Sequence, residues 1–322
     1  LKLLKEGDIH ILIGTHALIE DWVEFKNLGL AVIDEQHRFG VAQRAAALRA
    51  DAGGPRPDLL LLTATPIPRT LALTLYGDLD LTRIAGRPPG RSPVATTIAP
   101  LDAGTLLTAV RSALADGGRA FVIAPLRQAT RRRSSPDAES VAQRLSAALG
   151  ESAVALIHGG FADAAAETVL TRFREGRARV LVATTVVEVG IDVPEATLMV
   201  VLEPERFGLA QLHQLRGRVG RGLRPGRCLL LWRDPAAAER LAVLERHDDG
   251  LAVAEADLAR RGPGDLLGER QHGLEALRCT DLTRDGDLLV TAAELAGTQI
   301  TAGRPPPQEL LRLLPPAAAG AG

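Results

Sequence analysis

The feature that most constrains the fold is the alternation of short apolar runs with longer helical patterns along the chain. The runs are rich in Val, Ile and Leu, as is typical of strands that are buried on both faces of a parallel sheet. This pattern predicts an α/β fold built from parallel sheets with flanking helices. Strands are expected at residues 9–13, 30–33, 59–63, 120–124, 154–157, 180–183, 198–202 and 228–232, with helices between most of them, such as 137–149 and 162–174.

Chain length and a segment rich in proline and glycine predict the domain organisation. A chain of 322 residues suggests two domains. Residues 86–93 contain three prolines and two glycines, which interrupt both helices and strands, so this segment is expected to link two α/β units. Strand signals stop after residue 232 and a helical region follows from residue 235. We therefore expect a first lobe at 1–88, a second lobe at 92–233, a helical region at 234–302 and a disordered, low-complexity tail at 303–322.

Composition excludes several classes of protein. Basic and acidic residues are balanced, 38 against 39, so net charge alone does not indicate a nucleic-acid or membrane partner. Cys228 and Cys279 form neither a disulfide framework nor a zinc pattern, and nine aromatic residues are too few for a base-stacking platform. No apolar stretch reaches the length of a membrane span. A cytoplasmic protein without membrane contacts is expected.

A first candidate site follows the apolar run at residues 30–33. Asp34 and Glu35 stand together at the carboxyl end of this predicted strand, where open α/β sheets bind ligands, and Gln36 and His37 follow. In nucleotide-driven motors such acids hold Mg²⁺ through water and orient the attacking water. An acid pair that only caps a helix remains the alternative at this point.

A second candidate site follows the predicted strand at residues 59–63. Thr63 and Thr65 lie beside the stiff Pro66 turn, where their hydroxyls can link a carboxylate network to a neighbouring surface. Alternatively, Thr65 caps a helix with Pro66 in its first turn. Both interpretations can hold together.

A third candidate site spans residues 182–194. A strand, two hydroxyls, a glycine and an acid follow in quick succession, contributed by Thr184, Thr185, Gly190 and Asp192. The spacing predicts a tight loop that touches both a phosphodiester backbone and a ribose. A strand followed by a sharp turn is the alternative.

The fourth candidate site is a basic stretch. Residues 206–233 contain seven arginines and no acid, with Gln214, Arg218 and Arg221 at its centre. A solvated basic face is the usual explanation of such a run. Here glycines alternate with the arginines and allow guanidinium groups to approach a ligand closely, which favours stabilisation of phosphoryl charge.

A phosphate-cradling loop is missing from the sequence. Such a loop needs the order Gly-Lys-Ser/Thr, and none of the three lysines follows a glycine. Either the protein does not hydrolyse nucleotides, or its phosphate loop lies upstream of Leu1. Because the chain does not begin with Met, we expect it to be a piece of a longer protein.

Taken in order, the four sites resemble motifs II, III, V and VI of superfamily 2 helicases. The amino-acid sequences of these motifs resemble those of the RecG family of ATP-dependent DNA helicases, at residues 34–41, 63–70, 183–194 and 211–221. Residues 257–271 resemble the translocation motif that this family shares with the transcription-repair coupling translocase. The order Asp-Glu-Gln-His favours RecG, because the coupling translocase usually has Asp-Glu-Glu-Gln.

This resemblance implies two RecA-like lobes, the first partial and the second complete, and the use of ATP and Mg²⁺. Asp34 and Glu35 would manage Mg²⁺, largely through water, in a catalytic motif with Gln36 and His37. Arg218 and Arg221 would reach across the cleft to the γ-phosphate. Nucleotide binding would involve Asp34, Gly190, Asp192, Gln214, Arg218 and Arg221. Coupling and DNA contacts would involve Thr63, Thr65, Thr184, Thr185, Arg261, Arg270 and Gln271.

The resemblance also implies a function. Proteins of this family act as monomers on branched DNA such as stalled forks and Holliday junctions, and drive fork reversal or branch migration with ATP; a single-strand-binding protein is one possible partner. The family's N-terminal wedge domain and phosphate loop have no counterpart in the sequence, so the isolated chain is expected to lack ATPase activity. Two alternatives stay open: an ATP-independent nucleic-acid-binding remnant or accessory module, and an RNA helicase, which the motif wording disfavours.

Overall fold

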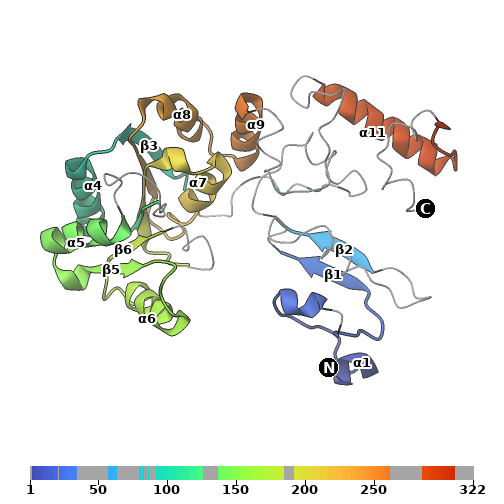
Figure 1. The fold of residues 1–322 in the computed structure, drawn as a ribbon, viewed down its shortest axis with the longest axis horizontal. Helices are drawn as coiled ribbons and strands as arrows, with labels where there is room; N and C mark the ends of the chain where they lie inside the picture. The colour runs from blue at the N-terminus through green and yellow to red at the C-terminus, as the bar shows by residue number, and fades with distance from the viewer. Residues whose placement is uncertain are drawn as a thin grey trace. The chain divides into compact units, whose positions relative to one another are not determined.

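The computed structural model describes residues 2–20, 22–34, 57–63, 80, 82, 84, 86, 92–125, 137–184, 192–261 and 285–308. The chain divides into two compact units, residues 1–66 and 67–322, and each is described by itself. Figure 1 shows their elements. Most of residues 64–91 lie outside the described ranges, so the linker at residues 86–93 stays a prediction.

The first unit contains a two-stranded parallel sheet. Strands β1 (Leu30–Ile33) and β2 (Asp58–Leu61) have the predicted bounds to within two residues. They pair with each other, and Ile33 lies opposite Leu61. Two short helices, α1 (Lys2–Glu6) and η1 (His16–Ile19), precede the sheet.

The strand predicted at residues 9–13 is wrong. This segment is irregular, and its side chains Ile11 and Ile13 are 81% and 90% exposed. A strand needs a neighbour for its backbone groups, and within the described part of this unit β1 and β2 pair with each other only. An apolar run is therefore not sufficient to form a strand here.

The second unit is built on a six-stranded parallel sheet with the order β3-β8-β7-β4-β6-β5. This confirms the α/β prediction. Five of its strands coincide with predicted ones, and the seven residues of the central β7 are all buried. The strands are β3 (Ala95–Pro100), β4 (Arg119–Ile123), β5 (Val154–Ile157), β6 (Val180–Ala183), β7 (Ala196–Leu202) and β8 (Arg227–Trp232).

Helices cover both faces of this sheet (Figure 1). Alternate residues of each strand point to opposite faces, so Phe121 joins one core and Val122 the other. Phe121 packs against Phe173 with ring centroids 5.0 Å apart. Helices α4 (Ala103–Ala115) and α5 (Ala138–Leu149) cover one face, and α6 (Asp163–Arg174), α7 (Leu209–Arg216) and α8 (Ala238–Arg246) cover the other. Helix α9 (Gly250–Arg261) packs on α7 and α8.

Side-chain caps explain where α4 and α5 begin. Asp102 accepts a hydrogen bond from the Thr105 N–H at 2.7 Å, and Asp137 accepts one from the Ser140 N–H at 2.7 Å. The hydrogen bonds from Thr105 also lower the pKa of Asp102. The helices predicted at residues 137–149 and 162–174 are thus confirmed as α5 and α6.

Strand β3 was not predicted, because its Thr-containing sequence lacks a continuous apolar run. It forms at an edge of the sheet, where one side of its backbone pairs with β8 and its side chains are only partly buried. Its last residue, Pro100, suits an edge because proline cannot donate to a neighbouring strand. On the open side, the Ile98 N–H donates to Oε1 of Glu245 on α8 at 2.8 Å. Helix α8 therefore covers this edge of the sheet.

Replacing Glu245 with alanine is expected to loosen this edge. The lost hydrogen bond is worth about 1 kcal/mol, so the amide proton of Ile98 should exchange with solvent about 5-fold faster. The Glu245→Gln variant keeps an acceptor oxygen and should exchange like the wild type. Equal exchange rates at Ile98 in all three proteins, measured by NMR, would show that Glu245 does not protect the edge.

Beyond β8 the described chain is helical, as predicted. The short 3-10 turn η6 (Pro235–Ala237) leads into α8, and α11 (Gly286–Thr301) is the last described helix. Two similar turns, η3 (Glu151–Ala153) and η5 (Pro204–Arg206), lie before β8. Among the helices that the structure describes, none has both the length and the apolar content needed to cross a bilayer. Residues 309–322 lie outside the described ranges, and disorder of the tail stays a prediction.

Candidate functional site

In the first unit, two predicted site residues lie at the same end of the sheet. Asp34 directly follows β1 and Thr63 lies two residues after β2, and both are exposed. The two strands run parallel, and the Leu62 N–H donates to the Ile33 carbonyl at 2.8 Å, which continues the pairing to this edge. The carboxyl ends of these neighbouring parallel strands thus place Asp34 and Thr63 at the same end of the sheet. Four other predicted residues lie outside the described ranges: Glu35, Gln36, His37 and Thr65.

In the second unit, Arg221 is held by two hydrogen bonds. Its Nη1 donates to Oδ1 of Asp192 at 3.0 Å, and its Nε donates to the Gly217 carbonyl at 3.0 Å. The arginine side chain is 32% exposed and that of Asp192 is 66% exposed. Its second terminal nitrogen, Nη2, makes no hydrogen bond to the described residues. The guanidinium is therefore held at two of its three nitrogens, and Nη2 has donors left for an external anion.

Glycines explain how the loop that carries Arg221 reaches its place. Gly220 adopts φ +68° and donates its N–H to the Ala196 carbonyl at 3.0 Å. A Cβ on Gly220 would lie 2.9 Å from the Gly226 nitrogen, and one on Gly222 would lie 2.6 Å from the Pro194 carbonyl oxygen. Besides the ligand approach inferred from the sequence, these glycines allow close contact between backbones. They join the loop to the segment that leads into β7.

Thr184 and Arg221 lie at opposite ends of the parallel strands. It follows the carboxyl end of β6, whereas Asp192 lies shortly before the amino end of β7. Both strands run in the same direction, and the seven residues of β7 span roughly 20 Å. The third candidate site, residues 182–194, thus has Thr184 at the carboxyl ends of the strands and Asp192 at their amino ends. Thr184 is 6% exposed, and its hydroxyl has no hydrogen-bond partner among the described residues.

The sequence analysis missed a third arginine of the basic stretch, Arg216. Its side chain is 5% exposed and lies between α7 and the end of α8. Nη1 donates to the carbonyls of Leu244 at 2.7 Å and His247 at 2.9 Å. Nη2 donates to the Asp248 carbonyl at 3.1 Å and lies 2.8 Å from Nδ1 of His213. Arg216 therefore connects the start of the loop between α7 and β8 (residues 217–226, the arginine loop) to the turn between α8 and α9.

A sequence signal for this role exists. Leu209 and Leu212 mark the buried face of α7, and Arg216 falls four residues after Leu212 on the same face. A charged residue at such a position needs buried partners. The last carbonyls of a helix lack partners within it and carry partial negative charge, so the end of α8 provides them.

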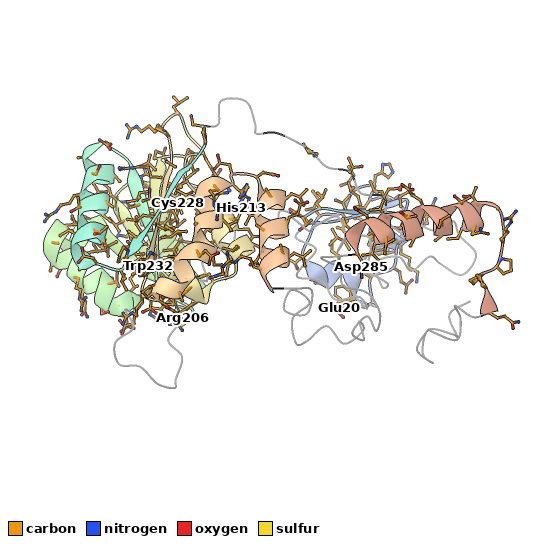
Figure 2. The ribbon with its side chains drawn as sticks, turned by 90° about the horizontal axis from the view of Figure 1, so that it is seen from above. Glu20, Arg206, His213, Cys228, Trp232 and Asp285 are labelled. Atoms are coloured by element: carbon orange, nitrogen blue, oxygen red, sulfur yellow. The ribbon has the colours of Figure 1, made fainter. Side chains whose placement is uncertain are left out.

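The other predicted residues of this motif lie on or next to α7. Gln214 is half-buried on the helix, and the backbone N–H of Arg218 donates to the Leu215 carbonyl at 3.0 Å just after it. Figure 2 labels His213 on α7 and Cys228 on β8. Burial raises the pKa of the Cys228 thiol to about 12, although the nearby charge of Arg216 lowers it in part. This cysteine stays a neutral thiol and belongs to the core.

The remaining predicted residues are not placed. Arg261 is the last residue of α9, but its side chain is outside the described part of the structure. The described residues contain no cluster of three or more His, Cys, Asp or Glu side chains suited to a metal ion. Thr185, Gly190, Arg270 and Gln271 lie outside the described ranges, and their roles stay predictions.

Three family models match the chain in succession. The DEAD/DEAH box helicase model matches residues 1–74, and the helicase conserved C-terminal domain matches residues 105–222. The model described as ATP-dependent DNA helicase RecG, domain 3, C-terminal, matches residues 247–305. The second model includes Arg216, Arg218 and Arg221, and the third begins at His247, whose carbonyl Arg216 binds.

Solved structures support the same fold. A structure of RecG bound to a three-way DNA junction is 45% identical, covers 89% of this chain and 37% of that chain, and has a TM-score of 0.67. The structure of S. cerevisiae Dbp5 bound to RNA and ADP BeF3 is 17% identical, covers 73% of this chain and 61% of that chain, and has a TM-score of 0.50. The second likeness concerns the fold alone. The RecA-like helicase architecture is thereby confirmed.

Curated relatives are about as similar to this chain as the RecG structure is. The ATP-dependent DNA helicase RecG of Thermotoga maritima is 47% identical over 90% of this chain, and that of Escherichia coli strain K12 is 44% identical over 92% of it. The chain spans 37% of the length of the first relative and 43% of the second. On this identity, together with the three successive family models, the chain belongs to the RecG family.

Proposed function

We propose that this chain is part of an ATP-dependent DNA helicase that remodels branched DNA by fork reversal and branch migration. The observation that carries the proposal is the held guanidinium of Arg221, with Nη2 left for an anion. The names of the relatives and the junction-bound RecG structure support the substrate class. Monomeric action, a cytoplasmic location and a single-strand-binding protein partner are part of the same proposal.

The residues suit a triphosphate and Mg²⁺. An arginine that is held at Nε and Nη1 can donate to a phosphate oxygen through Nη2. Arg218 and Arg221 would donate to the γ-phosphate, while Asp34 would hold Mg²⁺ through water and Glu35 would orient the attacking water. The bound Mg²⁺ would neutralise charge that develops on the phosphate oxygens.

Arg216 supplies a physical route from this chemistry to DNA movement. The residue lies two positions before Arg218 and binds three carbonyls at the end of α8 and the turn that follows. A shift of the arginine loop towards phosphate would therefore pull on α8 and α9. Arg261 ends α9, and the predicted translocation residues Arg270 and Gln271 follow it along the chain.

A chimera tests the proposal. This chain replaces the matching residues of the E. coli relative, which is 44% identical to it. We expect DNA-stimulated ATP hydrolysis and unwinding of a three-way DNA junction, with little unwinding of an RNA duplex of the same shape. A folded chimera that binds junction DNA but neither hydrolyses ATP nor unwinds DNA would contradict the helicase and favour an ATP-independent binding module.

The isolated chain should behave differently from the chimera. We expect it to bind branched DNA with an affinity that falls steeply between 50 and 200 mM salt, because phosphate contacts release counterions. It should show no measurable ATPase activity, since no lysine-containing phosphate loop is present in its sequence. Robust DNA-stimulated hydrolysis by the pure chain would show that the second expectation is wrong.

A further inference from the structure

We propose that Asp192 is a positioning residue for Arg221, and that its carboxylate acts on the guanidinium and not on the nucleotide. The inference rests on the proposed function and deepens it. Asp192 Oδ1 accepts from Arg221 Nη1 at 3.0 Å, while the Gly217 carbonyl accepts from Nε at 3.0 Å. Acceptors on two different nitrogens of the guanidinium fix both the place and the tilt of the planar group.

The segment that carries Asp192 is itself fixed against the arginine loop. Gly222 packs so closely on Pro194 that a Cβ there would lie 2.6 Å from the Pro194 carbonyl oxygen. Two residues further along, the Ala196 carbonyl accepts from the Gly220 N–H at 3.0 Å. Asp192 and Arg221 therefore come from two backbone segments that are joined directly before and after Arg221, by residues that lie two and four positions after Asp192. This arrangement distinguishes the pair from a casual contact between two long surface side chains.

The chemistry of the pair favours positioning over ligand binding. A free arginine side chain samples many rotamers, and ordering it costs conformational entropy. The hydrogen bonds to Asp192 and Gly217 order the side chain before the nucleotide binds. The guanidinium is therefore preorganised for the charge that develops in the transition state. The carboxylate occupies the Nη1 side, which leaves Nη2 for phosphate. A carboxylate placed directly on a phosphate would instead repel it.

The two roles predict different kinetics in the chimera. Loss of a positioning residue lowers kcat with little change in the KM for ATP, whereas loss of a nucleotide ligand raises KM. We expect Asp192→Ala to lower kcat by about 10-fold to 100-fold, with Asp192→Asn in between because the amide keeps a neutral acceptor. The double variant D192A/R221A should be no slower than R221A alone, since the carboxylate acts through the guanidinium.

A second measurement uses the isolated chain and needs no activity. The Nε–H signal of Arg221, assigned by its loss in R221K, should show restricted rotation of the guanidinium by NMR. Asp192→Ala should release this rotation. The matched control is Glu195→Gln, because Glu195 forms a similar ion pair with Arg119 at 3.3 Å and lies only three residues away. The control should leave the Arg221 signal unchanged.

The outcomes separate this inference from the proposed function. If Asp192→Ala raises KM at constant kcat, or if its effect adds to that of R221A, Asp192 is a nucleotide ligand and the inference is wrong. If R221A leaves ATP hydrolysis unchanged, the proposed role of Arg221 fails, whatever Asp192 does. An Arg221 signal that is equally mobile with and without Asp192 overturns the positioning role even if the chimera has no activity to measure.

Discussion

Replacing Arg221 with alanine in the chimera is expected to lower kcat for ATP hydrolysis at least about a thousandfold, because arginines that stabilise phosphoryl charge contribute factors of 10³ to 10⁵. The KM for ATP should change much less, since the guanidinium acts mainly in the transition state. Lysine cannot replace it, because an ammonium group lacks the planar fork that Asp192 and Gly217 hold. Steady-state kinetics with saturating junction DNA measure both values.

The structure provides a control in the same loop. Arg224 lies three residues later and donates to the Asp116 carbonyl, where it supports the turn after α4. Arg224→Ala should retain kcat within about threefold, which corresponds to less than 1 kcal/mol. Neither variant should alter the fold, because the lost contacts are on the surface. An R221A protein with more than a tenth of the wild-type kcat would refute the assigned role.

Replacing Arg216 with methionine is expected to lower the free energy of unfolding of the second unit by about 3–5 kcal/mol. Methionine fits the apolar face of α7, but it leaves the buried carbonyl of Leu244 and the partly buried carbonyls of His247 and Asp248 without their donor. Because whole domains are stable by only 5–15 kcal/mol, this change removes a large share of the total. Urea unfolding followed by far-UV circular dichroism measures the loss.

Two variants make the test of Arg216 specific. Arg144→Met makes the same substitution at an exposed site on α5, and should change stability by less than about 0.5 kcal/mol. Arg216→Lys keeps the charge but cannot reach three carbonyls at once, so it should recover only part of the loss. Hydrogen exchange should locate the damage in α8 and α9. A loss below about 1 kcal/mol in R216M would mean that the buried contacts do not hold these helices.

The two arginines also separate stability from chemistry. Arg221 is on the surface and should matter for rate, whereas Arg216 is buried and should matter for the connection between the arginine loop and the helices. A partly stable R216K chimera is thus expected to hydrolyse ATP with a reduced yield of unwound junction per ATP. Equal loss of hydrolysis and unwinding would place Arg216 in support of the loop alone.

Much of the second unit could be predicted from the sequence, because local patterns dominate there. Strands β5 and β6 begin and end where their apolar runs do, and Asp137 marks the start of α5 as a helix cap. Buried strands in a parallel sheet require continuous apolar sequence on both faces, so the pattern is visible one residue at a time. The resemblance of the four motifs to the RecG family likewise depends on short stretches of consecutive residues.

Local patterns failed where a neighbour distant in the sequence decided the outcome. Strand β3 has a half-polar sequence and forms because β8 pairs with one side and Glu245 covers the other. Residues 9–13 are apolar and remain irregular, because apolar side chains alone do not satisfy a strand's backbone. In both cases the hydrogen-bond partner is out of reach of any local pattern.

The sequence alone determined the α/β class, most strands of the second unit and the four motifs with their residue types. Only the tertiary structure decided that Asp192 binds Arg221 and that Thr184 lies at the opposite end of the strands from this pair. It also decided that Arg216 is buried and joins α7 to the end of α8, instead of being another surface cation. The physical reason is that residue type and periodicity are local, whereas the partner of a charge is set by which backbone segments the sheet brings together.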